Sequence, residues 1–411
     1  MRRLARAVFY AAAVVFWVGA LFMVLEVYQA GVEWSTENRN PHVGLVHLLM
    51  VWPSLVSEAD YVPVSGVAIP RAERLLDERL AGLGLVYTES QRTYLGVTFR
   101  LQTIPGAFER MWLTPFYLLR PNCPLTPCWS TNSLGFRDRE IKIPKPANLF
   151  RIICIGGSTT QEGPTNETTY PKLLEQMLNA HFQGRPPIEV INCGVDGMNS
   201  NTERRRIKDY LALEPDLAVE YGVVNDICPP LFLKWAEAWQ REAPWWQRGL
   251  RYSAFWSRKL EWVFLPNDAD AAEDFKAFTL ANLSKMGHAF RQRGIPMAVC
   301  SFACPDLARL DRRERAYLDW HLANMWESDN RYSMASYIRL VALYSRLLKP
   351  FCQENGLEYV PVAEGLSGGL DTFCDVCHMW PDNIRRKAEL VFEHLKGVIE
   401  SRIADAGGPG A

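Results

Sequence analysis

The stretch FRIICIGGS, residues 150–158, is a short apolar run that ends in Gly-Gly-Ser. Such a run is typical of a buried strand followed by a turn. Four comparable runs follow, with helical stretches between them: IEVINCG (188–194), DLAVEYGVVND (216–226), IPMAVCSFA (295–303) and LEYVPVA (357–363). Strands that alternate with helices predict a parallel sheet of five strands that is covered by helices on both faces.

Residues suited to chemistry stand at the ends of the first three runs. Ser158 follows two glycines, NCGVDG (192–197) lets backbone N–H groups approach a ligand closely, and Asn225 in GVVND offers a side-chain amide. Functional groups of such sheets gather at the carboxyl ends of the strands, so we expect these segments to lie together. Each segment alone is equally typical of an ordinary turn.

The segment CDVCHMWPDN, residues 374–383, has two interpretations. The spacing C-x-x-C-H, which ends at His378, is the attachment motif of a c-type haem. Asp375 and His378 also form D-x-x-H, the acid and base of a serine triad. One histidine cannot be both an iron ligand and a general base. The haem interpretation leaves the three earlier segments unexplained and requires a helical haem pocket, so the triad is favoured.

In their order along the chain, the four segments resemble the motif blocks of the SGNH hydrolases, also called GDSL-type esterases and lipases. IGGSTT resembles the nucleophile block, NCGVDG the glycine block, GVVND the asparagine block and DVCHMWPDN the final block. The upstream LLRPN and TNSLGFRDREI are similar to the lead-in of many membrane-anchored or secreted members. The resemblance covers residues 131–403 and implies a flavodoxin-like three-layer α/β sandwich around the five-stranded sheet.

The resemblance also implies the roles of five residues. Ser158 would be the nucleophile, His378 the general base and Asp375 the acid that orients the base. The backbone N–H groups of Ser158 and Gly197 and the side chain of Asn225 would form the oxyanion hole. No cofactor is implied. No metal is implied either, because there is no H-E-x-x-H and the seven histidines show no paired ligand spacing.

Three positions depart from the family pattern. Gly157 stands where the family name has Asp, Trp380 replaces a small polar helix cap, and Asn383 stands where glycine is common. Asparagine tolerates the left-handed backbone conformation, so the last exchange is mild.

The N-terminus carries an uncharged apolar run from Ala7 to Leu25, preceded by the three arginines of MRRLAR. At 1.5 Å per residue the run spans roughly 28 Å, enough for the hydrocarbon core of a bilayer. The arginines keep the N-terminus in the cytoplasm and send the rest of the chain across. The alternative is a cleaved signal peptide, but the run is long for one and Tyr28 fits the −3 cleavage position poorly. We therefore predict an uncleaved, single-pass signal anchor with an extracytoplasmic (periplasmic or extracellular) catalytic domain.

The chain divides into residues 1–28 (cytoplasmic tip and transmembrane anchor), 29–130 (membrane-proximal region), 131–403 (hydrolase domain) and 404–411 (disordered tail). An insertion at about 227–275 separates the third and fourth strands. It is either a lid or platform for sugars or acyl chains, or a helical segment packed against the sheet or the membrane surface. The second interpretation is favoured because tryptophan is usually structural. The insertion holds six of the fourteen tryptophans: Trp235, Trp239, Trp245, Trp246, Trp256 and Trp262.

All ten cysteines follow the apolar run, which fits an oxidising compartment. Cys123 and Cys128 flank a proline-containing loop and could bridge. The pair in CDVCH forms a local disulfide or stays as two thiols near the base. Cys154 and Cys300 lie in apolar strand-like runs and are expected to be buried thiols.

Charge narrows the classes of function. The formal net charge is −1, which leaves no basic excess to neutralise phosphates, so nucleic-acid binding is not expected.

We predict a membrane-anchored ester hydrolase that acts on an acylated glycan or lipid. The same triad would serve an O-acyltransferase that modifies an envelope or extracellular polysaccharide. A third hypothesis is a non-catalytic glycan-binding or assembly protein on the same fold. The sequence leaves the oligomeric state open.

Overall fold

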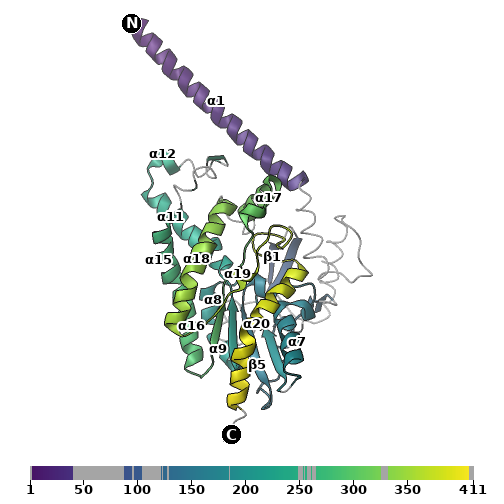
Figure 1. The fold of residues 1–411 in the computed structure, drawn as a ribbon. Helices are drawn as coiled ribbons and strands as arrows, with labels where there is room; N and C mark the ends of the chain where they lie inside the picture. The colour runs from purple at the N-terminus through teal and green to yellow at the C-terminus, as the bar shows by residue number, and fades with distance from the viewer. Residues whose placement is uncertain are drawn as a thin grey trace.

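A long N-terminal helix and an α/β body make up the protein in this computed structural model (Figure 1). The structure describes residues 2–39, 88–94, 97–103, 122, 124–126, 129–184, 186–248, 253, 255–256, 261, 265–324 and 332–406.

The body is built around a parallel sheet of five strands. They are β5 (Phe150–Gly156), β6 (Ile188–Asn192), β7 (Leu217–Tyr221), β8 (Met297–Cys300) and β9 (Glu358–Val360). Their spatial order is β6-β5-β7-β8-β9, and every neighbouring pair is parallel. This is the flavodoxin-like doubly wound order, in which the strand order reverses beside β5. It confirms the predicted fold class.

Helices cover both faces of this sheet. On one face α7 packs against α20 and β6, and on the other α16 packs against α8, α9 and β8, with α18 beside β9 (Figure 1). Their bounds are α7 (Tyr170–His181), α8 (Ser200–Arg205), α9 (Ile207–Ala212), α16 (Ala281–Arg291), α18 (Met334–Asn355) and α20 (Pro381–Ala406). The three layers follow because each strand-to-strand crossover carries a helix over one face of the sheet.

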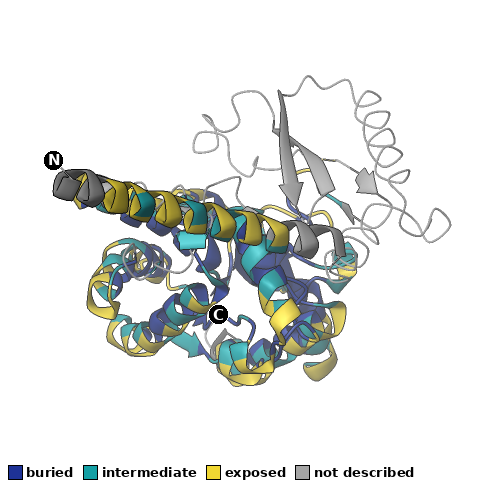
Figure 2. Cartoon of the chain, turned by 90° about the horizontal axis from the view of Figure 1, so that it is seen from above, coloured by how far each residue is buried: buried dark blue, intermediate teal, exposed yellow. Residues whose placement is uncertain are grey.

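The core lies on both sides of β5. Every residue of this strand is buried, and Ile152, Ile153 and Ile155 have no exposed surface. Strands buried on both faces read as continuous apolar runs, which explains why FRIICIG was recognisable in the sequence. Burying each such isoleucine stabilises the fold by about 1.5–3 kcal/mol. Figure 2 shows buried residues concentrated in the body, whereas α1 is exposed along most of its length.

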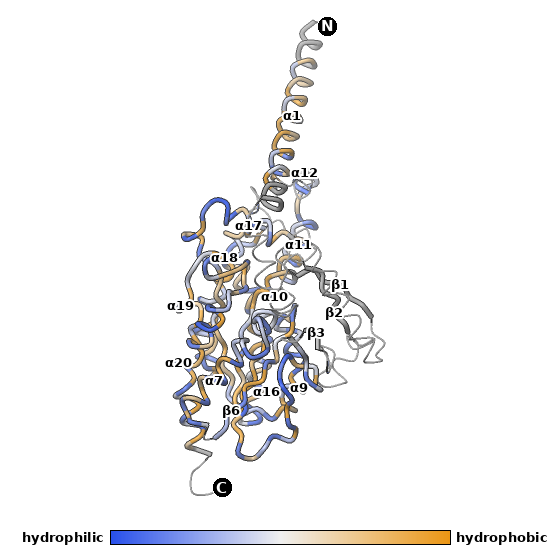
Figure 3. Tube along the Cα trace, turned by 90° about the vertical axis from the view of Figure 1, so that its right-hand side faces the viewer, coloured by the Kyte–Doolittle hydropathy of each residue, from blue (hydrophilic) through white to orange (hydrophobic). Residues whose placement is uncertain are grey.

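The N-terminal helix α1 (Arg2–Arg39) continues beyond the predicted boundary at residue 28. Within the described residues, the segment Phe9–Val32 is long and apolar enough to cross a membrane, with a mean hydropathy of 2.1. The apolar stretch is visible along α1 in Figure 3. A helix of this kind near the N-terminus is suited to be a membrane anchor or a signal sequence.

Several local expectations differ from the structure. The stretch NTERRRIKDYLALE (201–214) has the residue spacing of one helix, but it is broken into α8 and α9 at Arg206, which has φ −88° and ψ 8°. Helix α20 continues to Ala406, into the segment predicted to be a disordered tail. Strands β1 (Thr88–Tyr94) and β2 (Val97–Thr103) form an antiparallel hairpin that was not predicted in the membrane-proximal region. PRAERLLDERLAGLG (70–84), a stretch whose spacing is typical of an amphipathic helix that ends at glycine, lies outside the described residues.

Two short strands, β3 (Pro124–Thr126) and β4 (Trp129–Ser130), lead into the body. The tryptophan-rich insertion follows the third strand of the sheet as short helices. They are α10 (Val224–Asp226), η4 (Ile227–Leu231), α11 (Phe232–Glu242), α12 (Trp245–Arg248) and α15 (Asp268–Phe275). Trp235 is buried and donates its indole N–H to Asp274 Oδ2 at 2.5 Å, so the packing interpretation holds for this residue.

Candidate active site

Ser158 stands where the chain leaves the centre of the sheet. It is the first residue of the short helix α6 (Ser158–Gln161), two residues after β5 ends. The turn requires small residues, because a Cβ on Gly156 would lie 2.5 Å from the carbonyl oxygen of Tyr221. A Cβ on Gly157 would collide with the amide of Asn225. The turn therefore leaves no room for a side chain at residue 157 in this structure.

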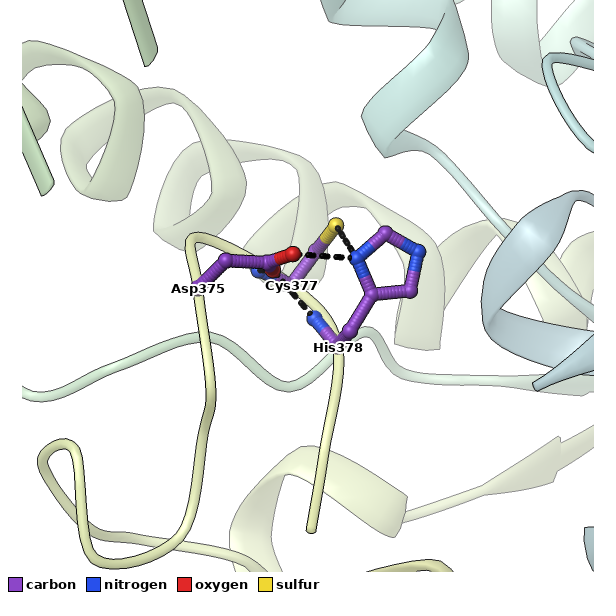
Figure 4. Close-up of side chains that lie close together, drawn as sticks. All are labelled: Asp375, Cys377 and His378. Carbon is purple, nitrogen blue, oxygen red and sulfur yellow. Dashed lines mark hydrogen bonds and ion pairs between the residues drawn. The ribbon is translucent and has the colours of Figure 1, made fainter. Parts of the chain in front are cut away.

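His378 joins Ser158 to Asp375. Its Nε2 lies 2.9 Å from Ser158 Oγ, and its Nδ1 lies 2.6 Å from Asp375 Oδ2 (Figure 4 shows the second contact). The other oxygen of Asp375, Oδ1, accepts the backbone N–H groups of Cys377 at 2.8 Å and His378 at 2.7 Å. The tight loop therefore fixes both the carboxylate and the imidazole. The three residues predicted as a triad lie in hydrogen-bonding order.

Burial and charge shift the pKa values of Asp375 and His378 in opposite directions. Burial alone raises the pKa of Asp375, but the charge and hydrogen bond of His378 lower it to below the ordinary value of 3.8. Burial alone lowers the pKa of His378, but the charge and hydrogen bond of Asp375 raise it to above the ordinary value of 6.5. The carboxylate is therefore ionised and is placed to stabilise an imidazolium.

Of the two predicted oxyanion residues, Gly197 lies in the loop after β6 and Asn225 in the short helix α10, and both are tied to the turn at Ser158. Asn225 donates one amide hydrogen to Met198 O at 2.8 Å, next to Gly197, which has a positive φ of 73°. The glycine loop is held to the end of β5 because Val195 N donates to Gly156 O at 3.1 Å. An amide carries two N–H donors, so Asn225 keeps one for a ligand beside Gly157.

A buried ion pair, which the sequence did not reveal, joins the end of α6 to α20. Lys387 Nζ lies 2.5 Å from Glu162 Oε1 and 2.7 Å from Thr159 O, and neither charged side chain is appreciably exposed. Glu162 Oε2 also accepts the backbone N–H of Met379 at 3.0 Å. The pair thus links the segment after Ser158 to the segment after His378.

A second unpredicted support comes from α17 (Arg312–Asn324). Tyr317 donates its hydroxyl to Cys374 O at 3.0 Å, and His321 Nε2 lies 3.6 Å from Asp375 Oδ2. The charge of His321 contributes to lowering the pKa of Asp375. Neither residue stands in a motif. Only the packing of α17 against the D-x-x-H loop reveals them.

The lead-in segment TNSLGFRDREI supports the same site. Arg137 is buried and donates to Gln161 O at 2.7 Å and Gly163 O at 2.8 Å, both shortly after Ser158 in the chain. Asp138 accepts the backbone N–H of Asn192 at 2.8 Å, which ties the lead-in to the glycine loop. The similarity of this segment to family lead-ins therefore has a structural counterpart.

Cys374 and Cys377 are free, buried thiols, so the thiol alternative holds and the local disulfide does not. Cys377 Sγ lies 3.4 Å from His378 Nδ1 (Figure 4), and burial raises its pKa well above 9.0. His378 Nε2, which a haem iron would need, faces Ser158 instead. Cys154 and Cys300 are buried thiols as predicted, whereas Cys123 and Cys128 lie outside the described residues.

One group of potential metal ligands occurs in the described part of the chain. The donor atoms of Asp375, Cys377 and His378 lie within 4.8 Å of one another. Asp375 and His378 already bond each other. Burial raises the pKa of the Cys377 thiol and keeps it protonated. The arrangement fits a proton-transfer site better than a metal centre.

Comparison with known proteins gives matches to solved structures alone, because no family model and no curated protein matches the chain. A lipase/acylhydrolase from Enterococcus faecalis is 14% identical, with 61% of this chain and 96% of that chain covered and a TM-score of 0.37. A member of the lipolytic protein G-D-S-L family from Veillonella parvula is 11% identical, with coverages of 59% and 97% and a TM-score of 0.34. An acetyl xylan esterase, AlAXEase, is 19% identical, with coverages of 59% and 98% and a TM-score of 0.35. Because these sequence identities and TM-scores are low, the activity of this chain has to be argued from its own site.

The raised pKa of His378 predicts the pH profile of any ester hydrolysis by the protein. The imidazole must be neutral to accept a proton, so kcat/KM should fall as the pH drops through a value above 6.5. Asp375→Asn removes the charge that raises this pKa. It should move the acid limb to lower pH and reduce kcat on the order of 10⁴-fold. An acid limb at or below 6.5 in the unaltered protein would contradict this account.

The Glu162–Lys387 pair predicts a stability effect. Lys387→Met leaves the Glu162 carboxylate buried without its partner and should destabilise the fold by about 3–5 kcal/mol in urea unfolding of the detergent-solubilised protein. Lys396→Met is the matched control, because Lys396 lies on the same helix and pairs with Glu393 at the surface. It should change stability by less than about 0.5 kcal/mol. Equal effects of the two substitutions would refute the structural role of the buried pair.

Proposed function

We propose that this protein is a serine-dependent ester hydrolase of the SGNH type. The observation that carries the proposal is the hydrogen-bonded series Ser158–His378–Asp375, with distances of 2.9 Å and 2.6 Å. A degenerate site on this fold would not be expected to keep a hydroxyl, an imidazole and an ionised carboxylate aligned in this way. The hypothesis of a non-catalytic binding protein is therefore disfavoured.

The arrangement supports acyl transfer in two steps. Ser158 Oγ attacks the ester carbonyl carbon while its proton passes to His378 Nε2, and Asp375 stabilises the imidazolium. His378 then gives the proton to the leaving alcohol, and the C–O bond breaks to leave an ester on Ser158. In the second step water attacks this ester and passes its proton to His378. The acid is released and the Ser158 hydroxyl is restored.

The negative oxygen of the tetrahedral intermediate needs hydrogen-bond donors. The backbone N–H groups of Ser158 and Gly197 and the second amide hydrogen of Asn225 are the donors that we assign. Their common attachment to the end of β5, through the Val195–Gly156 and Asn225–Met198 bonds, supports this assignment. It keeps the donors fixed relative to the nucleophile.

We infer that the substrate is an acylated glycan or a lipid outside the cytoplasm, and that α1 holds the protein at a membrane. The apolar length of α1 and the arginines before it support this placement. An O-acyltransferase uses the same first step, with a sugar hydroxyl in place of water in the second. Analysis of the products with and without an acceptor glycan separates the two: free acid in the presence of the acceptor supports hydrolysis, and acylated acceptor supports transfer.

Labelling with a fluorophosphonate probe tests the nucleophile. The full-length protein in detergent should be labelled and should hydrolyse p-nitrophenyl esters, and Ser158→Ala should lose both properties. His378→Ala should also abolish hydrolysis. Ser401→Ala is the matched control, because Ser401 lies on the exposed surface of α20 and should leave labelling unchanged. Retention of full activity by Ser158→Ala would eliminate the proposed mechanism.

Asn225→Ala tests the oxyanion hole. Loss of one such donor typically lowers kcat by about 10²–10³-fold, so a reduction of this size is expected with the ester probe. Asn355→Ala removes a comparable amide-to-carbonyl bond, 2.9 Å to Phe351 O, at the end of α18 and should leave kcat unchanged. If the two variants hydrolyse esters equally well, Asn225 has no part in catalysis.

A further inference from the structure

The C-terminal part of α1, from Leu25 to Val32, packs against the body. Along Phe9–Val24 nearly all side chains are exposed, but Gln29 is buried, and Leu25, Glu26 and Val32 are half-buried. Positions 25, 29 and 32 share one face of a helix. The uncharged run ends at Leu25, so contact with the body begins where the apolar segment ends.

The tryptophan-rich insertion meets α1 at the same level. Ser253 donates its hydroxyl to the carboxylate of Glu26, the first charged residue after the apolar run. The same hydroxyl accepts the backbone N–H of Trp256 at 2.9 Å. Phe255 and Trp256 are half-buried and lie edge to face, with ring centroids 5.2 Å apart. The aromatic part of the insertion is therefore fixed to the end of the apolar segment.

The exposed aromatic residues gather at this level too. Trp245 begins α12 with 83% of its surface exposed, and Tyr28 on α1 is 53% exposed. Figures 1 and 3, which differ by a quarter turn, both draw α12 at the level of the C-terminal part of α1, and Figure 1 shows a gap between them. Tryptophan and tyrosine favour the interface between lipid and water. The exposed Arg241 and Arg248 near Trp245 suit anionic headgroups.

The catalytic edge of the sheet lies near the same end of α1. Helix α17 contacts α1 and also supplies Tyr317 and His321 to the D-x-x-H loop. A helix of 13 residues is about 20 Å long, so α17 connects the D-x-x-H loop to α1 over no more than roughly that length of helix. In Figure 1, α17 stands between the end of α1 and the body.

We propose that Tyr28, Trp245, Phe255 and Trp256 form an interfacial aromatic patch that docks the body on the headgroup layer of a phospholipid bilayer. The docked body presents its catalytic edge to the membrane surface and takes amphiphilic esters held there. The proposal rests on α1 as the membrane anchor, which is part of the proposed function. It specifies the source of the substrate as the surface of the bilayer.

Fluorescence quenching tests the patch independently of catalysis. The full-length protein is placed in phosphatidylcholine/phosphatidylglycerol nanodiscs that contain lipids with a nitroxide quencher at the headgroup or deep in the acyl chain. The difference in emission between the unaltered protein and Trp245→Phe isolates the signal of Trp245. We expect headgroup quenchers to reduce this signal strongly and deep quenchers to reduce it little.

The control places a tryptophan at the opposite edge of the sheet. Ile143 is 43% exposed, and its neighbour Lys145 pairs with Asp216, next to the start of β7. Ile143→Trp in the Trp245→Phe background should not be quenched by either lipid. If Trp245 is quenched no more than this control, the proposal is overturned. The proposal is also overturned if a second copy of the chain covers Trp245. In that case Trp245 would be protected from the quenchers in discs that hold two copies but not in discs that hold one.

Activity measurements test the substrate source. Trp245→Glu places a charge in the patch and should lower kcat/KM for a vesicle-held ester by about fivefold, since interfacial charges act on this scale. It should leave hydrolysis of a soluble p-nitrophenyl ester unchanged, and Trp245→Phe should preserve both. An equal effect on both esters overturns the docking role. Quenching of Trp245 without hydrolysis of either ester would support docking and reject only the hydrolase.

Discussion

The hydrogen bond between His378 Nε2 and Ser158 Oγ joins two segments that are 220 residues apart. Much of the body serves to hold these atoms at 2.9 Å. The parallel sheet brings the ends of its strands to one edge. The Glu162–Lys387 pair fixes the two segments to each other, and α17 contacts the D-x-x-H loop through Tyr317. Because the supports are buried and mutually bonded, the imidazole has little freedom to leave the hydroxyl.

The fold could be predicted from the sequence because the central strands β5, β7 and β8 are buried along their whole length. FRIICIG and the four later runs read as apolar segments between helices, and their order fixes the chemistry at one edge. That Ser158, Asp375, His378 and Asn225 would lie at one edge of the sheet could be predicted because each stands at a strand end or in a spaced motif. The broken helix at Arg206 could not, since a local change in ψ leaves no pattern in the sequence.

The supporting residues could not be predicted because they belong to no motif. Lys387 lies in a helical stretch and Glu162 shortly after the Gly-Gly-Ser turn, and charged residues at such positions are ordinarily expected on the solvent side. His321 is one histidine among seven, and its neighbour Asp375 becomes evident only when α17 is placed. CDVCH is the opposite case, because here a motif is present without the function that it suggests. Its histidine, His378, faces a serine and not a haem iron.

The central claim is that Ser158 carries the acyl group between two reaction steps. The most direct measurement is rapid quenching of the reaction of the full-length protein with an activated ester, followed by peptide mass spectrometry. The account predicts an acyl adduct on the peptide that contains Ser158, formed before the steady state. Turnover with no adduct on Ser158, or with the adduct on Cys377, would contradict it.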